Sequence, residues 1–346
     1  MAQDLKDMTL EQLKGLVGEC GQREYLAGYV FRFVQRMGVT EIDAITPLSK
    51  AFRAELAKRG FYISSLEIRE KLVDEDGTAK YVFGLADGGQ IESVLLKDGG
   101  RRTMCVSTQV GCAMGCAFCA TARVRWRRNC TAAEIVDQVI CVERNGERIS
   151  NVVYMGMGEP LENTDAVLRS VAILNKDEGK GIGIRHLTIS TCGIVPGIRR
   201  LANAELRPRL AVSLNAPDDA LRRRIMPVAR KYPLGALMEA LREYQRLTQQ
   251  RVTFEYVMLR GVNDAAEQAR RVVRLLRPLR SHVNLIELNP HAGCTFAGSD
   301  SGTIRRFAGV LEEAGIETTI RFRMGRGICA ACGQLGAERG RKEGTP

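Results

Sequence analysis

The chain has 346 residues and a net charge of +11, with 51 lysines and arginines against 40 aspartates and glutamates. A hydrophobic fraction of 45% with 26% charged residues excludes an intrinsically disordered chain, and the absence of any apolar run of about 18 residues predicts no membrane-spanning segment. The positive charge favours an acidic partner such as nucleic acid, although a solvated arginine surface would give the same balance.

Residues 1–60 are predicted to form a small helical domain. Leu10, Leu13 and Leu16 share one helical face, and the charged N-terminal stretch lacks the apolar core of a signal peptide, so we expect a cytoplasmic protein. Residues 61–102 consist of short alternating runs separated by Asp-Gly and Gly-Gly. These dipeptides are typical of hairpin turns, and they predict an antiparallel β-strip that links the two parts of the chain.

The region 103–335 alternates between predicted strands and helices. This rhythm indicates an α/β core with a parallel sheet, whose six or so βα units close fully or partly into a barrel. We expect residues 336–346 to be a disordered tail. The predicted strands are 103–110, 151–157, 185–191, 208–214, 251–259, 282–288 and 317–323.

Polar residues stand where four successive predicted strands end. Ligands of such folds bind at the carboxyl ends of the strands, and polar turns also follow strands for purely structural reasons. Their repetition on neighbouring strands favours one shared ligand site. The residues are Gly158, Glu159, Ser190, Ser213, Leu214, Asn215 and Asn289.

Eleven cysteines are many for a chain that lacks a secretory signal, which favours metal binding or catalysis over disulfides. Cys112, Cys116 and Cys119 form a C-x3-C-x2-C motif directly after the first strand of the core. Three thiolates at this spacing can bind one iron–sulfur centre and leave one iron open for a ligand. The alternative is a zinc site that a distant cysteine or histidine completes.

The cysteine motif resembles that of the radical S-adenosylmethionine (radical SAM) enzymes, and longer stretches resemble the RlmN/Cfr group of adenosine methyltransferases. The resemblance covers essentially the whole chain, and residues 1–60 are similar to the RNA-recognition module of the group. It implies a partial (β/α)6-type radical SAM barrel that carries a 4Fe-4S cluster on the three cysteines. It also implies that the strand-exit residues bind S-adenosylmethionine. The stretches are MCVSTQVGCAMGCAFCATA, NVVYMGMGEPLEN, LTISTCGIVPGI, LAVSLNAP, FEYVMLRGVND and AACGQL.

The resemblance also implies catalytic roles for three further residues. Cys332 matches the cysteine that accepts a methyl group from a first S-adenosylmethionine, and a second molecule supplies the radical that activates this methyl group. Glu92 matches the acidic proton acceptor. Cys105 matches the cysteine that attacks the Cys332 sulfur and leaves a disulfide to be reduced. Without the resemblance, Glu92 would be interpreted as a solvated strand residue, Cys105 as a packed cysteine, and Cys332 as a surface thiol or a redox partner of Cys329.

The implied reaction is methylation of C2 of an adenosine in 23S rRNA, with the adenosine beside the tRNA anticodon as a further candidate substrate. The resemblance implies two S-adenosylmethionine molecules per methylation and a flavodoxin- or ferredoxin-like electron donor, and we expect a monomer. Two alternatives remain. One is methylation of C8 of the same rRNA adenosine, as in the Cfr branch. The other is a non-enzymatic iron–sulfur or zinc RNA-binding protein.

Four arginines surround Trp126 directly after the cysteine motif, between Arg123 and Arg128. They favour phosphate contacts with a base stacked on the tryptophan, and a solvated arginine run is the alternative. Arg125 occupies a position at which the group usually has glycine. A second departure lies at Gly327–Cys332, where GICAAC replaces the usual Asp-Ile-Asp/Glu-Ala-Ala-Cys. Both departures concern RNA specificity more than the chemistry.

Overall fold

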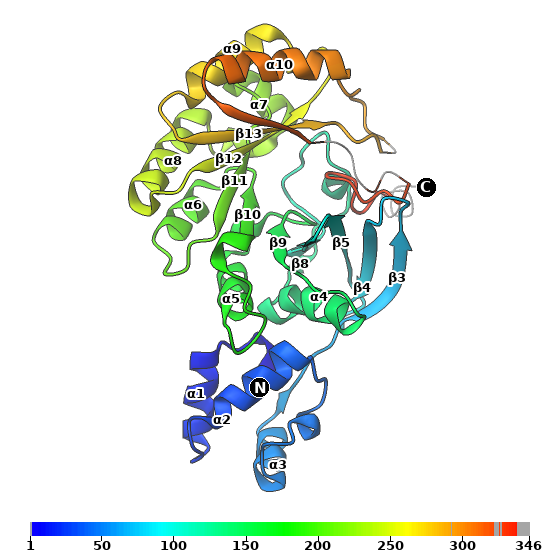
Figure 1. The fold of residues 1–346 in the computed structure, drawn as a ribbon, viewed down its shortest axis with the longest axis vertical. Coiled ribbons are helices and arrows are strands. Elements are labelled where there is room, and N and C mark those ends of the chain that lie inside the picture. The colour runs from blue at the N-terminus through cyan, green and yellow to red at the C-terminus, as the bar shows by residue number, and fades with distance from the viewer. Residues whose placement is uncertain (1, 292, 322–324, 326, 338–346) are drawn as a thin grey trace.

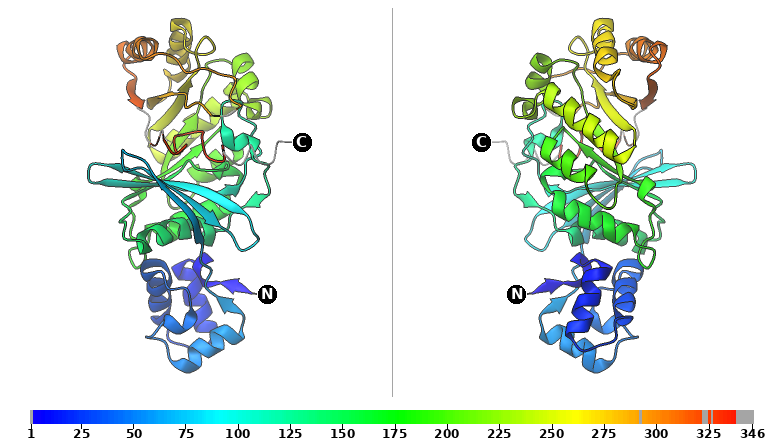
Figure 2. Two further views of the ribbon diagram at one scale, coloured as in Figure 1. Left: turned by 90° about the vertical axis from the view of Figure 1, so that its right-hand side faces the viewer. Right: turned by 90° about the vertical axis from the view of Figure 1, so that its left-hand side faces the viewer.

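A computed structural model describes residues 2–291, 293–321, 325 and 327–337. The chain forms a helical N-terminal part, followed by a large twisted sheet with helices packed along one side (Figures 1 and 2). Of the predicted tail, residues 338–346 lie outside the described part, and so do the last two residues of the strand predicted at 317–323.

The N-terminal part is helical, as the leucine spacing predicts. It contains α1 (Leu10–Glu19), α2 (Leu26–Phe31), which continues as a π-helix over Arg32–Met37, and α3 (Lys50–Lys58). Helix α1 begins at a capping box, in which the Thr9 side chain accepts from the Gln12 backbone N–H and the Gln12 side chain accepts from Thr9. Two short strands, β1 (Gln3–Asp4) and β2 (Phe61–Tyr62), pair in parallel and bring the two ends of this part together.

Ten strands form one sheet in the order β14-β13-β12-β11-β10-β9-β6-β5-β4-β3. The predicted strip supplies the antiparallel strands β3 to β5, and β6 joins them to the parallel strands through its pairing with β9. The predicted strip and core therefore share a single sheet. The strands are β3 (Glu67–Val73), β4 (Ala79–Gly84), β5 (Gln90–Asp98), β6 (Arg101–Cys105), β9 (Asn151–Tyr154), β10 (Leu187–Thr191), β11 (Arg209–Ser213), β12 (Val252–Met258), β13 (Ser281–Glu287) and β14 (Glu317–Arg321).

The parallel strands follow one another in sequence order, with a helix between most neighbours, as in a partly closed barrel. The strand predicted at 103–110 is divided. Its first half belongs to β6, and its last two residues form β7 (Gln109–Val110), which pairs with β8 (Arg128–Asn129). The longer helices are α4 (Ala132–Arg144), α5 (Thr164–Asn175), α6 (Val195–Ala202), α7 (Asp219–Ile225), α8 (Leu234–Thr248), α9 (Ala266–Leu276) and α10 (Ser301–Glu313).

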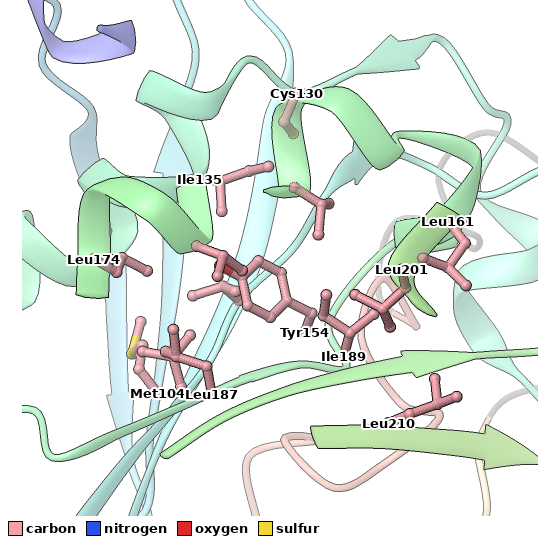
Figure 3. Packing of buried hydrophobic residues seen from close by; sticks show 14 of the residues in the cluster. Met104, Cys130, Ile135, Tyr154, Leu161, Leu174, Leu187, Ile189, Leu201 and Leu210 are labelled. Carbon is pink, nitrogen blue, oxygen red and sulfur yellow. The ribbon is translucent and has the colours of Figure 1, made fainter. Parts of the chain in front are cut away.

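The main core lies between the sheet and the helices that cover it and continues into the N-terminal helices, and Figure 3 shows the part of it around Tyr154. Tyr154 at the end of β9 is fully buried there, and its hydroxyl lies 2.9 Å from the Ser170 hydroxyl of α5. Strand residues such as Ile189 and Leu210 are buried in the same cluster. Burial of this face fixes the register of the strands. Because strands β6 and β9 to β14 are parallel, their carboxyl ends all lie at the same edge of the sheet.

Candidate active site

A cavity lies at the carboxyl ends of the parallel strands, with an empty volume of about 1010 Å³ including its open mouth. Residues that the sequence predicts to share a site do line it together. They are Cys112, Cys116, Cys119, Gly158, Ser190, Ser213, Asn215, Asn289 and Cys332.

The cysteine loop follows β7 and is held by its backbone. Gly111 has a φ of +79°, and a Cβ atom there would lie 2.3 Å from the Arg125 carbonyl oxygen, so only glycine fits. The Ala117 N–H donates to the carbonyl of Ile225, at 2.9 Å. Burial raises the pKa of all three predicted ligand thiols, and for Cys116 the neighbouring thiols raise it further. Metal binding would therefore displace protons from this loop.

Two of the predicted strand-exit residues, Glu159 and Leu214, are buried beneath the cavity instead of lining it. The Glu159 carboxylate accepts from the backbone N–H groups of Leu161, at 3.0 Å, and Cys192, at 2.7 Å. It therefore ties the exit of β9 to the exit of β10. The Leu214 N–H donates to the Glu255 carbonyl at 3.0 Å and fixes β11 against β12. Both residues position the loops that line the cavity.

Gly158 and Asn215 adopt left-handed backbone conformations at the cavity edge. Gly158 has a φ of +99°, and a Cβ atom there would lie 2.6 Å from the Cβ of Gln109. Asn215 has a φ of +55°, and its side-chain oxygen accepts from the Val257 N–H at 2.8 Å. Asparagine tolerates this conformation better than most residues, and here its side chain joins the exits of β11 and β12.

The segment around Cys332 closes one side of the cavity, and backbone groups hold it. The Asn289 side-chain N–H donates to the Cys332 carbonyl at 3.1 Å, and the Ala120 N–H donates to the Gly333 carbonyl at 2.8 Å. The Cys332 residue itself is exposed, and it lines the cavity. The thiol lies within the cavity, where desolvation raises its pKa even though the residue is open to solvent, and the positive charge of Arg321 partly offsets this rise.

Cys105 and Glu92 are not among the described residues that line the cavity, and they lie on the adjacent strands β6 and β5. Burial raises the pKa of Cys105, and the charge of Cys332 raises it further. Cys105 packs against a small cluster of buried residues that includes Ala330 and Leu335, from the segment that carries Cys332. All described cysteines are free thiols.

Glu92 is only 4% exposed, which rules out the interpretation as a solvated strand residue. Its Oε2 accepts from the Gly336 N–H at 3.1 Å and lies 3.9 Å from Lys80 Nζ.

Sequence reasoning missed two buried charged residues beside the cavity, Arg222 and Glu255. Arg222 is fully buried, donates to the carbonyls of Cys192 and Ser213, and has an Nη1 atom without a hydrogen-bond partner among the described residues. Glu255 lies in β12 and lines the cavity. The sequence held a signal for Glu255, which is a charged residue inside the apolar run Phe-Glu-Tyr-Val. A charged residue is rarely buried without a specific partner, so a charge in a predicted buried strand indicates a candidate functional residue.

The arginine stretch around Trp126 divides into two groups. Arg128 forms ion pairs with Asp87, at 2.7 Å, and Glu134, at 2.8 Å, which makes it a structural residue. Trp126 is 44% exposed, and Arg125 and Arg127 beside it are exposed without an ion pair among the described residues. Arg123, at the start of the stretch, is exposed as well. Only Arg128 is thus assigned a structural role here, and RNA contact by the rest of the stretch stays a prediction.

Comparison with known proteins identifies the family. A family model described as the ribosomal RNA large subunit methyltransferase N-terminal domain matches residues 3–61, and the radical SAM superfamily model matches residues 106–273. The chain is 47% identical to a probable dual-specificity RNA methyltransferase RlmN of Symbiobacterium thermophilum, with 96% of this chain and 91% of the relative covered. The chain belongs to the RlmN family of radical SAM methyltransferases.

Two further comparisons agree over nearly the full length of the chain. The dual-specificity RNA methyltransferase RlmN of Syntrophobacter fumaroxidans is 45% identical, with 97% of this chain and 98% of the relative covered. The crystal structure of a radical SAM methyltransferase from Sphaerobacter thermophilus matches with a TM-score of 0.90 at 43% identity, covering 97% and 99% of the two chains. These findings confirm the resemblance and the radical SAM fold. The family implies S-adenosylmethionine and an iron–sulfur cluster as cofactors.

The cysteine loop fits an iron–sulfur cluster better than a zinc ion. Its donors are three thiols that line one cavity, and thiolates are the usual ligands of such clusters. Among the described residues, no group of three or more histidine, cysteine or acidic side chains is placed to hold a metal ion between them. Within the described part of the chain, no helix is long and apolar enough to cross a membrane.

Proposed function

We propose that this protein methylates C2 of an adenosine in 23S rRNA, and the corresponding atom of the adenosine beside the tRNA anticodon. One observation carries the proposal. A single cavity joins the cysteine loop, the strand-exit residues and Cys332, with Cys105 and Glu92 on the strands beside it. The relatives named above are dual-specificity RNA methyltransferases, which supports an RNA substrate.

The proposed cofactors are one 4Fe-4S cluster and two S-adenosylmethionine molecules per methylation. Cys112, Cys116 and Cys119 would hold the cluster, which supplies the electron for reductive cleavage of S-adenosylmethionine. The residues Gly158, Ser190, Ser213, Asn215 and Asn289 would bind the cofactor from the strand ends. Glu159 and Leu214 act indirectly, by holding the backbone of these exits in place.

Cys332 would carry the transferred methyl group on its sulfur. The segment that bears it is fixed through main-chain carbonyls, which leaves the thiol free to face the cavity. Glu92 would accept the proton that leaves the base, and Lys80 at 3.9 Å stabilises its carboxylate. Once the activated methyl carbon links the Cys332 sulfur to the base, the Cys105 thiolate would attack that sulfur and form a Cys105–Cys332 disulfide. The sulfur–carbon bond would break in this step, and its electron pair together with a proton would complete the methyl group of the released base. We also propose that the protein is a monomer in the cytoplasm and receives electrons from a donor of the flavodoxin or ferredoxin type.

The target adenine must leave its stack to enter the cavity, as in other enzymes that modify nucleobases. We propose that Arg125, Trp126 and Arg127 hold the flanking RNA. The double change Arg125→Gln and Arg127→Gln should weaken RNA binding and reduce the magnitude of the slope of log K against log salt by about 1.4 to 1.8, since each phosphate contact contributes roughly 0.7–0.9. Fluorescence anisotropy at several salt concentrations measures this slope.

The matched control for this prediction removes two exposed arginines from another surface. Arg277→Gln with Arg305→Gln produces the same change in net charge on and beside helices α9 and α10. We expect the control to leave the slope nearly unchanged. Equal slopes for the two double variants would show that the Trp126 loop makes no specific phosphate contact.

The reaction itself is tested with anaerobically reconstituted protein, reductant, methyl-labelled S-adenosylmethionine and unmodified 23S rRNA. Mass spectrometry of the digested nucleosides should reveal 2-methyladenosine. Detection of 8-methyladenosine would assign the protein to the alternative C8 reaction. RNA binding without cleavage of S-adenosylmethionine would instead support the non-enzymatic alternative.

A further inference from the structure

Glu255 is an acidic residue in the middle of the sheet. It lies on β12, where it pairs with Ser213 of β11 and Asn284 of β13. Figure 1 shows these three strands side by side. The residue is only 6% exposed, and its side chain lines the cavity that contains the cysteine loop and Cys332. Neither the family comparisons nor the strand-exit pattern assigns it a role.

The Glu255 carboxylate is only half satisfied. Its Oε1 accepts from the Asn284 side-chain N–H at 2.8 Å. Its Oε2 is buried and has no hydrogen-bond partner among the described residues. Burial raises the pKa of this carboxyl, while the charge of Arg321 and the Asn284 hydrogen bond oppose the rise. A buried oxygen without a partner costs free energy, so a residue of this kind is expected where a ligand brings the missing donor.

The position of Glu255 in the cavity indicates which end of a bound ligand it would contact. The cysteine loop lies near the exits of β10 and β11. The Ala117 N–H donates to the carbonyl of Ile225 at the end of α7, and the Arg222 side chain of α7 donates to the carbonyls of Cys192 and Ser213. Glu255 lies on β12, one strand from β11 and two strands, or about 10 Å at the usual strand spacing, from β10. Ser213 and Asn215, which also line the cavity, stand between the cysteine loop and Glu255. A ligand that extends from the cysteine loop past Ser213 and Asn215 would reach Glu255 with its far end.

We propose that Glu255 Oε2 accepts a hydrogen bond from the adenosyl portion of S-adenosylmethionine, either from a ribose hydroxyl or from the adenine amino group. This inference rests on the proposed function, since it takes S-adenosylmethionine as the ligand of the cavity. An ionised acceptor is suited to this task because hydrogen bonds to charged groups are about twice as strong as neutral ones. Glu255 is thus a cofactor-binding residue beyond those that the strand-exit pattern predicts.

The test is Glu255→Gln, which preserves shape and can keep the Asn284 hydrogen bond through its amide oxygen. The amide nitrogen then takes the place of Oε2. Its N–H group faces the hydrogen-bond donor of the ligand and cannot accept a hydrogen bond from it. Affinity of the reconstituted protein for S-adenosylhomocysteine, measured by anaerobic calorimetry, should fall by about 10- to 100-fold. In the absence of ligand, the variant should unfold at the same or a higher temperature, because a buried unpartnered charge has been removed.

A second probe locates the contact. 5′-Methylthioadenosine lacks the amino-acid portion, so the loss of affinity in Glu255→Gln should persist with this probe. A loss confined to S-adenosylhomocysteine would overturn the adenosyl assignment and place the contact at the ammonium group. A lower unfolding temperature with unchanged affinity would show a purely structural role.

The control is Glu143→Gln, a change of the same kind on helix α4. The Glu143 carboxylate accepts from the Ile149 N–H and pairs with Lys180, and it does not line the cavity. We expect this variant to bind both probes like the wild type. If the wild type binds neither probe and methylates no RNA, the proposed function fails. If the wild type does both and Glu255→Gln binds equally well, only this inference fails.

Discussion

Replacing Cys332 by alanine should abolish RNA methylation while the protein stays folded and retains its iron. The side chain is exposed, and alanine keeps its Cβ atom, so little packing is lost. The segment is held by hydrogen bonds to the carbonyls of Cys332 and Gly333, which alanine retains. Without the sulfur, no atom at this position can carry a methyl group. Nucleoside mass spectrometry measures methylation, and iron analysis with the visible absorbance of the cluster checks the iron.

Cys329 provides the matched control, because it is a second cysteine in the same segment. Its backbone has a φ of +49°, which alanine tolerates no worse than cysteine does. We expect Cys329→Ala to methylate RNA and to show a methylated Cys332 peptide after incubation with S-adenosylmethionine. Normal turnover by Cys332→Ala would contradict its role as the methyl carrier. Loss of activity in both variants would mean that the segment, and not the Cys332 sulfur, is what the reaction requires.

The sequence predicts most of the architecture because the relevant signals are local. Hydrophobic alternation and Asp-Gly turns mark β4 and β5, and the βα rhythm marks the parallel strands, whose observed bounds differ from the predicted ones by a few residues. The joining of the strip and the core in one sheet was not predicted. It depends on the pairing of β6 with β9, a contact between residues nearly 50 positions apart.

Some residues of the candidate site could likewise be predicted from local sequence signals, and others depend on contacts that only the folded structure shows. Residues at or after strand ends, such as Ser190 and Asn289, could be predicted to share a site, because the carboxyl ends of parallel strands lie at the same edge of the sheet. The buried position of Glu159 could not, since it depends on acceptor geometry toward the backbone N–H groups of Leu161 and Cys192. The unpartnered oxygen of Glu255 is likewise a property of three packed strands and of no motif.

Replacing Lys6 by methionine should destabilise the protein by about 3–5 kcal/mol, the usual cost of breaking one side of a buried ion pair. Lys6 Nζ lies 2.6 Å from Asp137 Oδ1, and the two side chains are 0% and 1% exposed. The other Asp137 oxygen accepts from the Leu66 N–H at 2.6 Å. Asp137 lies on α4, the helix that follows β8, and β8 in turn follows the cysteine loop in the sequence. The ion pair therefore joins the N-terminal helical part to the elements that support the site. Urea unfolding measures the change in free energy.

Two comparisons distinguish this buried pair from an ordinary charge effect. Lys14→Met removes a lysine whose pair with Glu24 is solvent-exposed, with side chains 46% and 67% exposed, so it should cost less than about 1 kcal/mol. The double change Lys6→Met and Asp137→Leu removes both buried charges and should recover most of the loss, because the penalty arises from one uncompensated charge and not from the missing attraction. The Leu66 N–H would still lack its acceptor, so recovery should stop about 1–3 kcal/mol short of the wild type. A Lys6→Met variant as stable as Lys14→Met would show that the N-terminal part is joined to the barrel by apolar packing alone.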